Sequence, residues 1–228
     1  MACGNHQDRD LYYEEDLSSP TMSLESIFIL ISFAAQWNAH IATADITGAY
    51  LKSSLEPNDI VYTFLSKDSV DQLKKLDPKI IKHIMADGRA LVRLLKALYG
   101  TIQATKLWYR KLKEITTSYG FCQHPHDQCV FGYVQNGILM IVDFHVDDLL
   151  TICKVRSMID AFIAYLLTCV TNVIVHYEAQ QTYLGMLIGR EDDNTVSISM
   201  VGYIDKVLKV YDLSDRYNCK ISPTRQYF

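Results

Sequence analysis

The sequence lacks any long apolar run. Its longest stretch, Ile27 to Ala35, is interrupted by Ser32 and is shorter than the roughly 20 residues that a helix needs to cross a bilayer. The first 16 residues are polar and acidic, without the apolar core of a signal peptide. We therefore expect no membrane among the partners of this protein.

Cysteine pairs with metal-ligand spacing are also missing. None of the six cysteines, at positions 3, 122, 129, 153, 169 and 219, belongs to a Cys-x-x-Cys motif. This pattern favours reduced thiols packed as small hydrophobic groups over a disulfide framework or a zinc site. The chain also has no internal repeat, low-complexity tract or Gly/Ser linker. Its 228 residues fit one domain, or one domain with part of a second.

Positive charge is scarce. Lys and Arg number 22 against 26 Asp and Glu, which gives a formal net charge of −4, whereas proteins contact nucleic-acid phosphates through Lys and Arg. Two local clusters, Lys106 to Lys113 and Lys74 to Lys82, would supply basic faces, although the second has the pattern of an ordinary solvated helix surface. Hydrophobic residues make up 49% of the chain and charged residues 21%, a balance that supports a buried core.

The apolar pattern predicts an α+β fold with a largely antiparallel sheet. Asn136-Gly137 separates two β-rich runs, which is a strong hairpin signal. A second hairpin follows, with Asp147-Asp148 in its turn. The predicted helices cover residues 23–36, 68–85 with a break at Pro78, 103–119, 155–170 and 203–211. The predicted strands cover residues 39–45, 60–65, 90–95, 129–134, 138–145, 149–153, 173–177, 182–188 and 195–200.

The adjacent aspartates between two apolar strands are the main chemical signal. Burying such charges is costly unless a hard cation such as Mg²⁺ compensates them. Phosphoryl transfer between nucleotides uses two such ions about 3.5–4 Å apart, so Asp147-Asp148 would need a further carboxylate. Asp45 is the best candidate because it ends the predicted strand 39–45, and Gly48 shortly afterwards would let the backbone approach a ligand.

An ordinary turn is the alternative, because Asp favours turns. Asp192-Asp193 precedes Asn194 in an obvious solvent turn, and we interpret that pair as nothing more. Asp143 lies within the strand before the acidic turn. We expect it to face an edge of the sheet or to have a charged partner, with a role as a spare metal ligand as the other possibility.

Four segments, in order, resemble the motifs of copia-type (Pseudoviridae) long-terminal-repeat retrotransposon reverse transcriptases. Residues 43–51 (TADITGAYL) resemble motif A, residues 98–109 (LYGTIQATKLWY) motif B, residues 144–150 (FHVDDLL) motif C, and residues 183–186 (YLGM) the segment near the primer grip. Ser222-Pro-Thr224 falls where the family places a similar tripeptide. Four ordered motifs are far more specific than any one of them.

The resemblance implies a right-hand polymerase palm with partial fingers and the start of a thumb. Residues 1–18 would form a polar tail and residues 19–228 the reverse transcriptase domain, with the thumb beginning near residue 195. The implied activity is RNA-directed DNA polymerisation with two Mg²⁺ ions, Mn²⁺ being possible. The implied partners are an RNA or DNA template with its primer, deoxynucleoside triphosphates and other Pol domains. The expected location is cytoplasmic, in a virus-like particle for an active element, with the nucleus as an alternative.

The resemblance also implies roles for individual residues. Asp45, Asp147 and Asp148 would be the catalytic metal ligands, and Tyr50 would be the steric gate that favours deoxynucleotides. The other implied nucleotide-binding residues are Ile46, Thr47, Gly48, Ala49, Tyr99, Gly100 and Gln103, and the implied primer-grip residues are Tyr183, Leu184, Gly185 and Met186. Trp108 and Tyr109 would either stack on bases of a single strand or pack in the core, and their place within a helix favours the core.

Some features depart from the family. His145 replaces a Tyr before Val-Asp-Asp, and Ile102 and Thr105 replace the Lys and Pro of motif B. The chain is expected to begin after the family's basic fingers strands and to end before a full thumb or an RNase H domain. We therefore expect weak or absent primer extension from it alone. The alternative function is a non-catalytic, retrotransposon-derived remnant or domesticated protein that binds nucleic acid or a protein partner.

Overall fold

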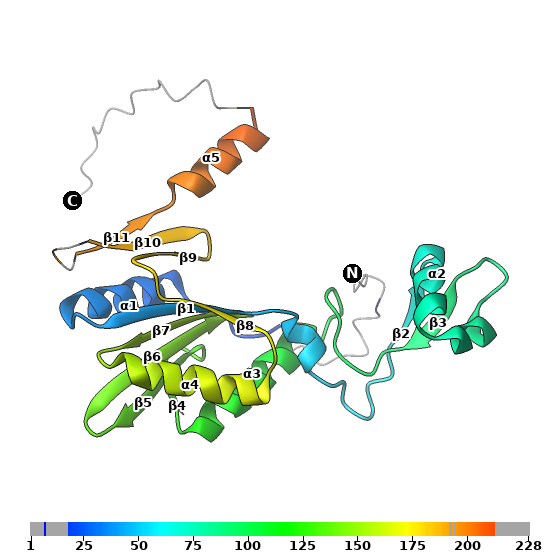
Figure 1. Ribbon diagram of the computed structural model, residues 1–228, viewed down its shortest axis with the longest axis horizontal. Coiled ribbons are helices and arrows are strands. Elements are labelled where there is room, and N and C mark those ends of the chain that lie inside the picture. Colours follow the sequence, from blue (N-terminus) through cyan, green and yellow to red (C-terminus); the bar gives the residue numbers. More distant parts are fainter. Residues whose placement is uncertain (1–6, 8–17, 192, 194, 213–228) are drawn as a thin grey trace.

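A six-stranded antiparallel sheet forms the main body of the protein in the computed structural model, which describes residues 7, 18–191, 193 and 195–212 (Figure 1). Its strands follow the order β4-β5-β6-β7-β1-β8. They are β4 (Cys122–Gln123), β5 (Val130–Gln135), β6 (Ile138–His145), β7 (Asp148–Cys153), β1 (His40–Ile46) and β8 (Val173–His176). The early strand β1 thus lies between two strands that come much later in the chain.

Helices cover both faces of this sheet (Figure 1). One face packs against α3 (Ala104–Tyr119) and α4 (Arg156–Cys169). The other packs against α1 (Leu24–Gln36) and a small sheet of β9 (Gln180–Tyr183), β10 (Met186–Arg190) and β11 (Val196–Ser199). Because side chains alternate along a strand, Val142 of β6 joins the α3 side, whereas Ile141 joins the α1 side. The predicted α+β fold with an antiparallel sheet is confirmed.

Smaller elements extend from this body. The strands β2 (Tyr62–Leu65) and β3 (Ala90–Arg93) pair with each other and, with α2 (Lys67–Leu76) and the 3-10 helix η5 (Pro78–His83), lie to one side of the main sheet in Figure 1. A second 3-10 helix, η4 (Ala49–Lys52), follows β1, and α5 (Val201–Val210) follows β11. The predicted break at Pro78 is confirmed, since α2 ends just before it.

Local signals account for several of these boundaries. The Ser23 hydroxyl accepts a hydrogen bond of 3.0 Å from the Ser26 backbone N–H and so caps α1. Gly120, with φ of +115°, ends α3. Asn136 and Gly137 have φ of +51° and +77° and form the tight turn between β5 and β6, as hairpins of this kind require.

Two predictions are wrong. Residues 182–188 do not form one strand, because Leu184 and Gly185 take φ of +48° and +79° and reverse the chain between β9 and β10. Asp143 does not face an edge, and none of the residues that the structure describes is its charged partner. It lies on β6 between β5 and β7, its side chain is 0% exposed, and neither carboxylate oxygen has a hydrogen-bond partner within the described residues.

Several predicted features fall on residues that the structure does not describe. The predicted tail 1–18 is among them, except for Gln7 and Ser18. The Ser222-Pro-Thr224 tripeptide and two of the cysteines are among them as well. The four described cysteines, at positions 122, 129, 153 and 169, are free. None of the helices described here is long and apolar enough to span a membrane.

Candidate active site

Asp45 and Asp148 lie opposite each other on neighbouring strands. The register of β1 and β7 pairs their Cα atoms directly, and side chains paired in this way project from the same face of a sheet. Both residues are half-buried. The Thr47 hydroxyl donates a hydrogen bond of 3.2 Å to Asp45 Oδ2. Two acidic residues far apart in the sequence are therefore paired at one end of the sheet.

Asp147 belongs to the tight turn between β6 and β7. His145 pairs with Asp148 across this hairpin, so Val146 and Asp147 form the turn itself. Val146 has φ of +60°, a conformation that costs a β-branched residue on the order of 1–3 kcal/mol. Two hydrogen bonds hold the turn in place: the Ile46 backbone N–H donates to the Asp147 carbonyl at 3.0 Å, and Trp108 Nε1–H donates to the Val146 carbonyl at 2.6 Å.

Trp108 thus has a role that the sequence did not reveal. Its side chain is 1% exposed, which places it in the core as expected and excludes stacking on a nucleic-acid base. The same indole supports the acidic turn. No local signal distinguishes this role from plain packing, because the bond joins α3 to a turn that comes much later in the chain.

We expect Trp108→Phe to lower the free energy of unfolding by about 1–3 kcal/mol, because the mutation removes the donor to the buried side of the turn. Chemical denaturation at neutral pH measures the change. Trp37→Phe, at the other tryptophan of the chain, is the control, since Phe can keep the ring stacking of Trp37 on Phe33. Equal losses in the two variants would contradict a specific role for the Trp108 bond.

The carboxylates influence one another's charge. Burial, followed by the charge of Asp45, raises the pKa of Asp147 above its usual value. Burial also raises the pKa of Asp148, with further contributions from Asp147 and Asp45, while nearby His145 opposes the shift. Like charges held close together in a partly buried site favour binding of a cation.

The three side chains do not form a ready-made ligand set. Over residues 18–191 and the shorter described stretches, no group of three or more His, Cys, Asp or Glu side chains is arranged to hold a metal ion. The donor chemistry suits a hard cation, but the carboxylates do not converge on one point. Their assignment as metal ligands stays a prediction.

Two tyrosines stand beside this cluster. The rings of Tyr50 and Tyr99 lie 4.5 Å apart between centroids, inclined at 53°. Burial raises the pKa of both phenols, and the charge of Asp147 raises each further. Tyr50 reaches this position because Gly48, with φ of +70°, turns the chain from β1 into η4. The structure therefore brings motif A, motif B and the acidic turn together.

The other predicted nucleotide-binding residues lie around these tyrosines. Ile46 and Ala49 are buried, so only their backbone is available to a ligand, whereas the side chain of Thr47 is exposed. Gly100 is exposed, with φ of +92°. Gln103 is 4% exposed at the start of α3, and its Nε2 has no hydrogen-bond partner within the described part of the chain. A buried amide with an unused donor is suited to a ligand group.

The predicted primer-grip segment divides into two parts. Tyr183 and Met186 are 2% and 1% exposed and pack between α1 and the main sheet. Burial raises the Tyr183 pKa well above its usual value, and Asp143 and Asp148 contribute to the shift. Leu184 and Gly185 form the turn, and Gly185 is exposed. If this segment approaches a primer, it does so through the turn.

A cavity of about 730 Å³ lies elsewhere, between α1 and the segment before β5. Ile29 and Phe33 of α1 line it, together with His124 and Asp127 of the segment before β5. None of the predicted site residues lines this cavity, so it is separate from the aspartate cluster.

Family comparison agrees with the order of the motifs. Residues 1–225 match the family model described as "Reverse transcriptase (RNA-dependent DNA polymerase)", and the chain belongs to this family. Its antiparallel sheet, with helices on both faces and the acidic hairpin at one end, is the palm of a right-hand polymerase.

Individual relatives indicate a narrower class of protein than the family model does. The chain is 26% identical over 215 residues to the "Retrovirus-related Pol polyprotein from transposon TNT 1-94" of Nicotiana tabacum, a match that covers 93% of this chain and 15% of the relative. It is 28% identical over 155 residues to the corresponding polyprotein from transposon RE2 of Arabidopsis thaliana, covering 66% of this chain and 9% of the relative. The predicted copia-type resemblance is confirmed, and the chain spans a small part of each polyprotein.

A solved structure is also similar. Telomerase from Candida albicans, determined with a fragment of telomeric RNA, aligns with 89% of this chain and 40% of its own at 12% identity, with a TM-score of 0.39.

Proposed function

We propose that this chain is the nucleotidyl-transfer region of an RNA-directed DNA polymerase that extends a primer on an RNA or DNA template with deoxynucleoside triphosphates. The direct pairing of Asp45 with Asp148 beside the turn that holds Asp147 carries the proposal. Family membership supports the proposed reaction, and this geometry supports its location at the acidic hairpin. Other Pol domains would complete the enzyme in a polyprotein.

The cofactor proposal rests on donor chemistry. Asp45, Asp147 and Asp148 would hold Mg²⁺, or Mn²⁺ in its place, once their side chains turn toward a common point. Two ions bound there would stabilise the attacking and leaving oxygens of the transferred phosphate. The protein itself would fix the turn through Trp108 and Ile46, so that the carboxylates keep their position as a nucleotide arrives.

Primer extension tests this proposal. The protein, in excess over a labelled DNA primer on an RNA template, is mixed with deoxynucleotides and Mg²⁺ or, separately, Mn²⁺. We expect slow addition that depends on the template and stops with EDTA. The alternative, a remnant that only binds nucleic acid or a protein, is favoured by the formal net charge of −4 and by Ile102 and Thr105 in place of the Lys and Pro of motif B. Binding of the primer-template without extension under either ion would establish the alternative.

Tyr50 gives a prediction about sugar selection. Its ring, held beside Tyr99 and near Asp147, would occupy the space that a ribose 2′-hydroxyl needs. We expect Tyr50→Val to reduce the preference for deoxynucleotides over ribonucleotides by about 10- to 100-fold. The ratio of single-nucleotide addition efficiencies measures this preference.

Tyr50→Phe is the matched control for this prediction, because it removes the hydroxyl and keeps the ring. We expect it to change the preference by less than about threefold. A Val variant that still selects deoxynucleotides would remove Tyr50 from the proposed gate.

A further inference from the structure

Strand β1, which carries Asp45, has a gap along one edge. β7 pairs with it from His40 to Asp45, but β8 pairs only from Thr43 to Ile46. Thr43 lies opposite His176, the last residue of β8, so the backbone groups of β1 before Thr43, such as the Ile41 carbonyl, have no strand partner on the β8 side. Such groups, when buried, need a hydrogen bond to avoid a loss of stability.

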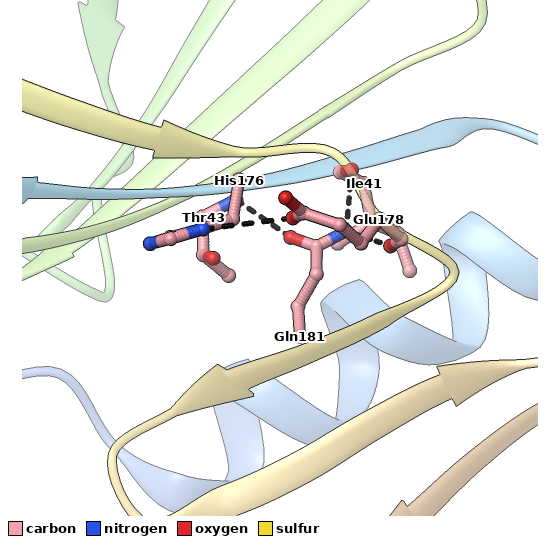
Figure 2. A network of polar contacts seen from close by, with 5 residues as sticks. All are labelled: Ile41, Thr43, His176, Glu178 and Gln181. Carbon is pink, nitrogen blue, oxygen red and sulfur yellow. Dashed lines mark hydrogen bonds and ion pairs between the residues drawn. The ribbon is translucent and has the colours of Figure 1, made fainter.

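The side chain of Gln181 fills this gap (Figure 2). Its Oε1 accepts a hydrogen bond of 2.9 Å from the Thr43 N–H, and its Nε2 donates one of 3.0 Å to the Ile41 carbonyl. A primary amide offers a donor and an acceptor side by side, so this one continues the ladder of β8 as a peptide group would.

The same amide also holds the chain that leads into β9. Its Nε2 donates a second hydrogen bond, of 2.9 Å, to the Glu178 carbonyl. Figure 2 shows this connection together with His176, whose Nδ1 lies 3.5 Å from a Glu178 carboxylate oxygen. Gln181 is 7% exposed, and both protons of its amide nitrogen are in use. It is therefore a buried, fully bonded bridge between two sheets that share no strand.

On each strand, the residue that forms the bridge lies two positions before a residue of the candidate site. Asp45 lies two residues beyond Thr43 on β1, and Tyr183 lies two residues beyond Gln181 on β9, directly before the Leu184-Gly185 turn. Side chains two apart on a strand share a face, so Asp45 lies on the Thr43 face of β1 and Tyr183 on the Gln181 face of β9. Tyr183 is also close enough to Asp148 for that charge to raise its pKa. Arg190 makes a separate link, to the end of α1, through the carbonyls of Ala34 and Ala39.

We infer that Gln181 is a positioning residue: it sets the place of the Leu184-Gly185 turn, and with it the primer end, relative to Asp45. The inference rests on the proposed function, since it assigns the turn to the primer. A misplacement of about 1 Å at a reacting centre can cost about 100-fold in rate, so loss of the bridge would act on the chemical step. None of the predicted nucleotide-binding residues lies on β9, and the only one on β1 is Ile46, which pairs with Val173 of β8, so we expect loss of the bridge to leave nucleotide affinity largely intact.

Three variants test the inference. Gln181→Met keeps the length of the side chain and removes the amide. Gln181→Glu keeps the acceptor for Thr43 and, as a carboxylate, loses the donor to Ile41 and Glu178. Gln180→Met alters the exposed neighbouring side chain and is the matched control. Thermal unfolding of each variant identifies any that fails to fold.

Two measurements are made on each variant: amide exchange at Thr43 reports on the hydrogen bonds of Gln181, and single-nucleotide addition reports on the activity. We expect the Thr43 amide to exchange with solvent at least about tenfold faster in Gln181→Met than in the wild type or Gln180→Met. We expect the maximal rate of single-nucleotide addition per active site to fall about 10- to 100-fold, while the nucleotide concentration for half-maximal rate changes less than about threefold. Gln181→Glu should fall between Met and wild type in both.

Each other outcome has a definite meaning. Unchanged exchange at Thr43 overturns the bridge. Faster exchange with an unchanged addition rate overturns the positioning role and leaves a purely structural contact. A wild-type protein that never extends a primer overturns the proposed function and the positioning role drawn from it, while the exchange result still decides whether the bridge exists.

Discussion

Asp147→Asn is expected to reduce primer extension by about 1,000-fold or more. The change removes the charge that a divalent ion requires, and loss of a metal-stabilised transition-state charge is worth several kcal/mol. The fold should survive, because Asp147 accepts the bond from Ile46 through its backbone carbonyl, which Asn retains. Single-turnover addition with Mg²⁺, together with a denaturation curve for each protein, measures both effects.

Asp193→Asn is the matched control for this loss. Asp193 lies in the exposed turn before β11, where its carboxylate accepts a hydrogen bond from the Thr195 N–H, and Asn can accept the same bond. Extension by this variant should match the wild type. Extension that persists in Asp147→Asn, or that is lost equally in both variants, would show that Asp147 is not a metal ligand.

Asp143→Asn is expected to have a higher free energy of unfolding than the wild type, by a difference that grows as the pH rises from about 4 to about 8. Burial, with a contribution from Asp127, raises the pKa of Asp143 to about 8, whereas an unfolded Asp titrates near pH 4. Below about pH 4 both states hold the proton and the wild type suffers no penalty. Between the two values only the unfolded state releases it, so wild-type stability falls by at most about 1.4 kcal/mol per pH unit.

Urea denaturation of both proteins at several pH values from 4.5 to about 8.5 tests this expectation through the gap between their unfolding free energies. The gap should widen with pH by several kcal/mol in total and level off near the upper end. Asp205→Asn, on the exposed side of α5, should show no such trend. Parallel pH profiles for the wild type and Asp143→Asn would mean that Asp143 is not buried in solution as it is in the structure.

Local patterns in the sequence were sufficient for much of the fold and for proposing the residues of the candidate site. Asn136-Gly137 predicted one hairpin and the Asp147-Asp148 turn the next, because turn chemistry depends on neighbouring residues. Asp45 emerged because it ends a predicted strand and is soon followed by Gly48. The motif resemblance then added Tyr50 and Tyr99, which the structure places side by side.

What the sequence missed depends on contacts between distant segments. Leu184 gives no local sign of a positive φ, so the sequence predicts a continuous strand where the structure has the turn between β9 and β10. The burial of Asp143 follows from the core on the α1 side of the sheet, to which Tyr183 belongs, and no pattern within β6 records that packing. The bonds of Trp108 to the acidic turn and of Gln181 to β1 join residues far apart in the chain, and only the assembled sheets reveal them.

The central place of β1 has a consequence for how the protein is made. The hairpins β5–β6 and β6–β7 pair neighbouring segments, so they can form soon after they leave the ribosome, whereas β1 must wait for β7 and β8 to be synthesised. During that interval an apolar strand is left without partners, and such strands pair readily with other chains. We therefore expect overproduction of this protein to be limited by aggregation of nascent chains, and slower synthesis at low temperature to raise the soluble yield.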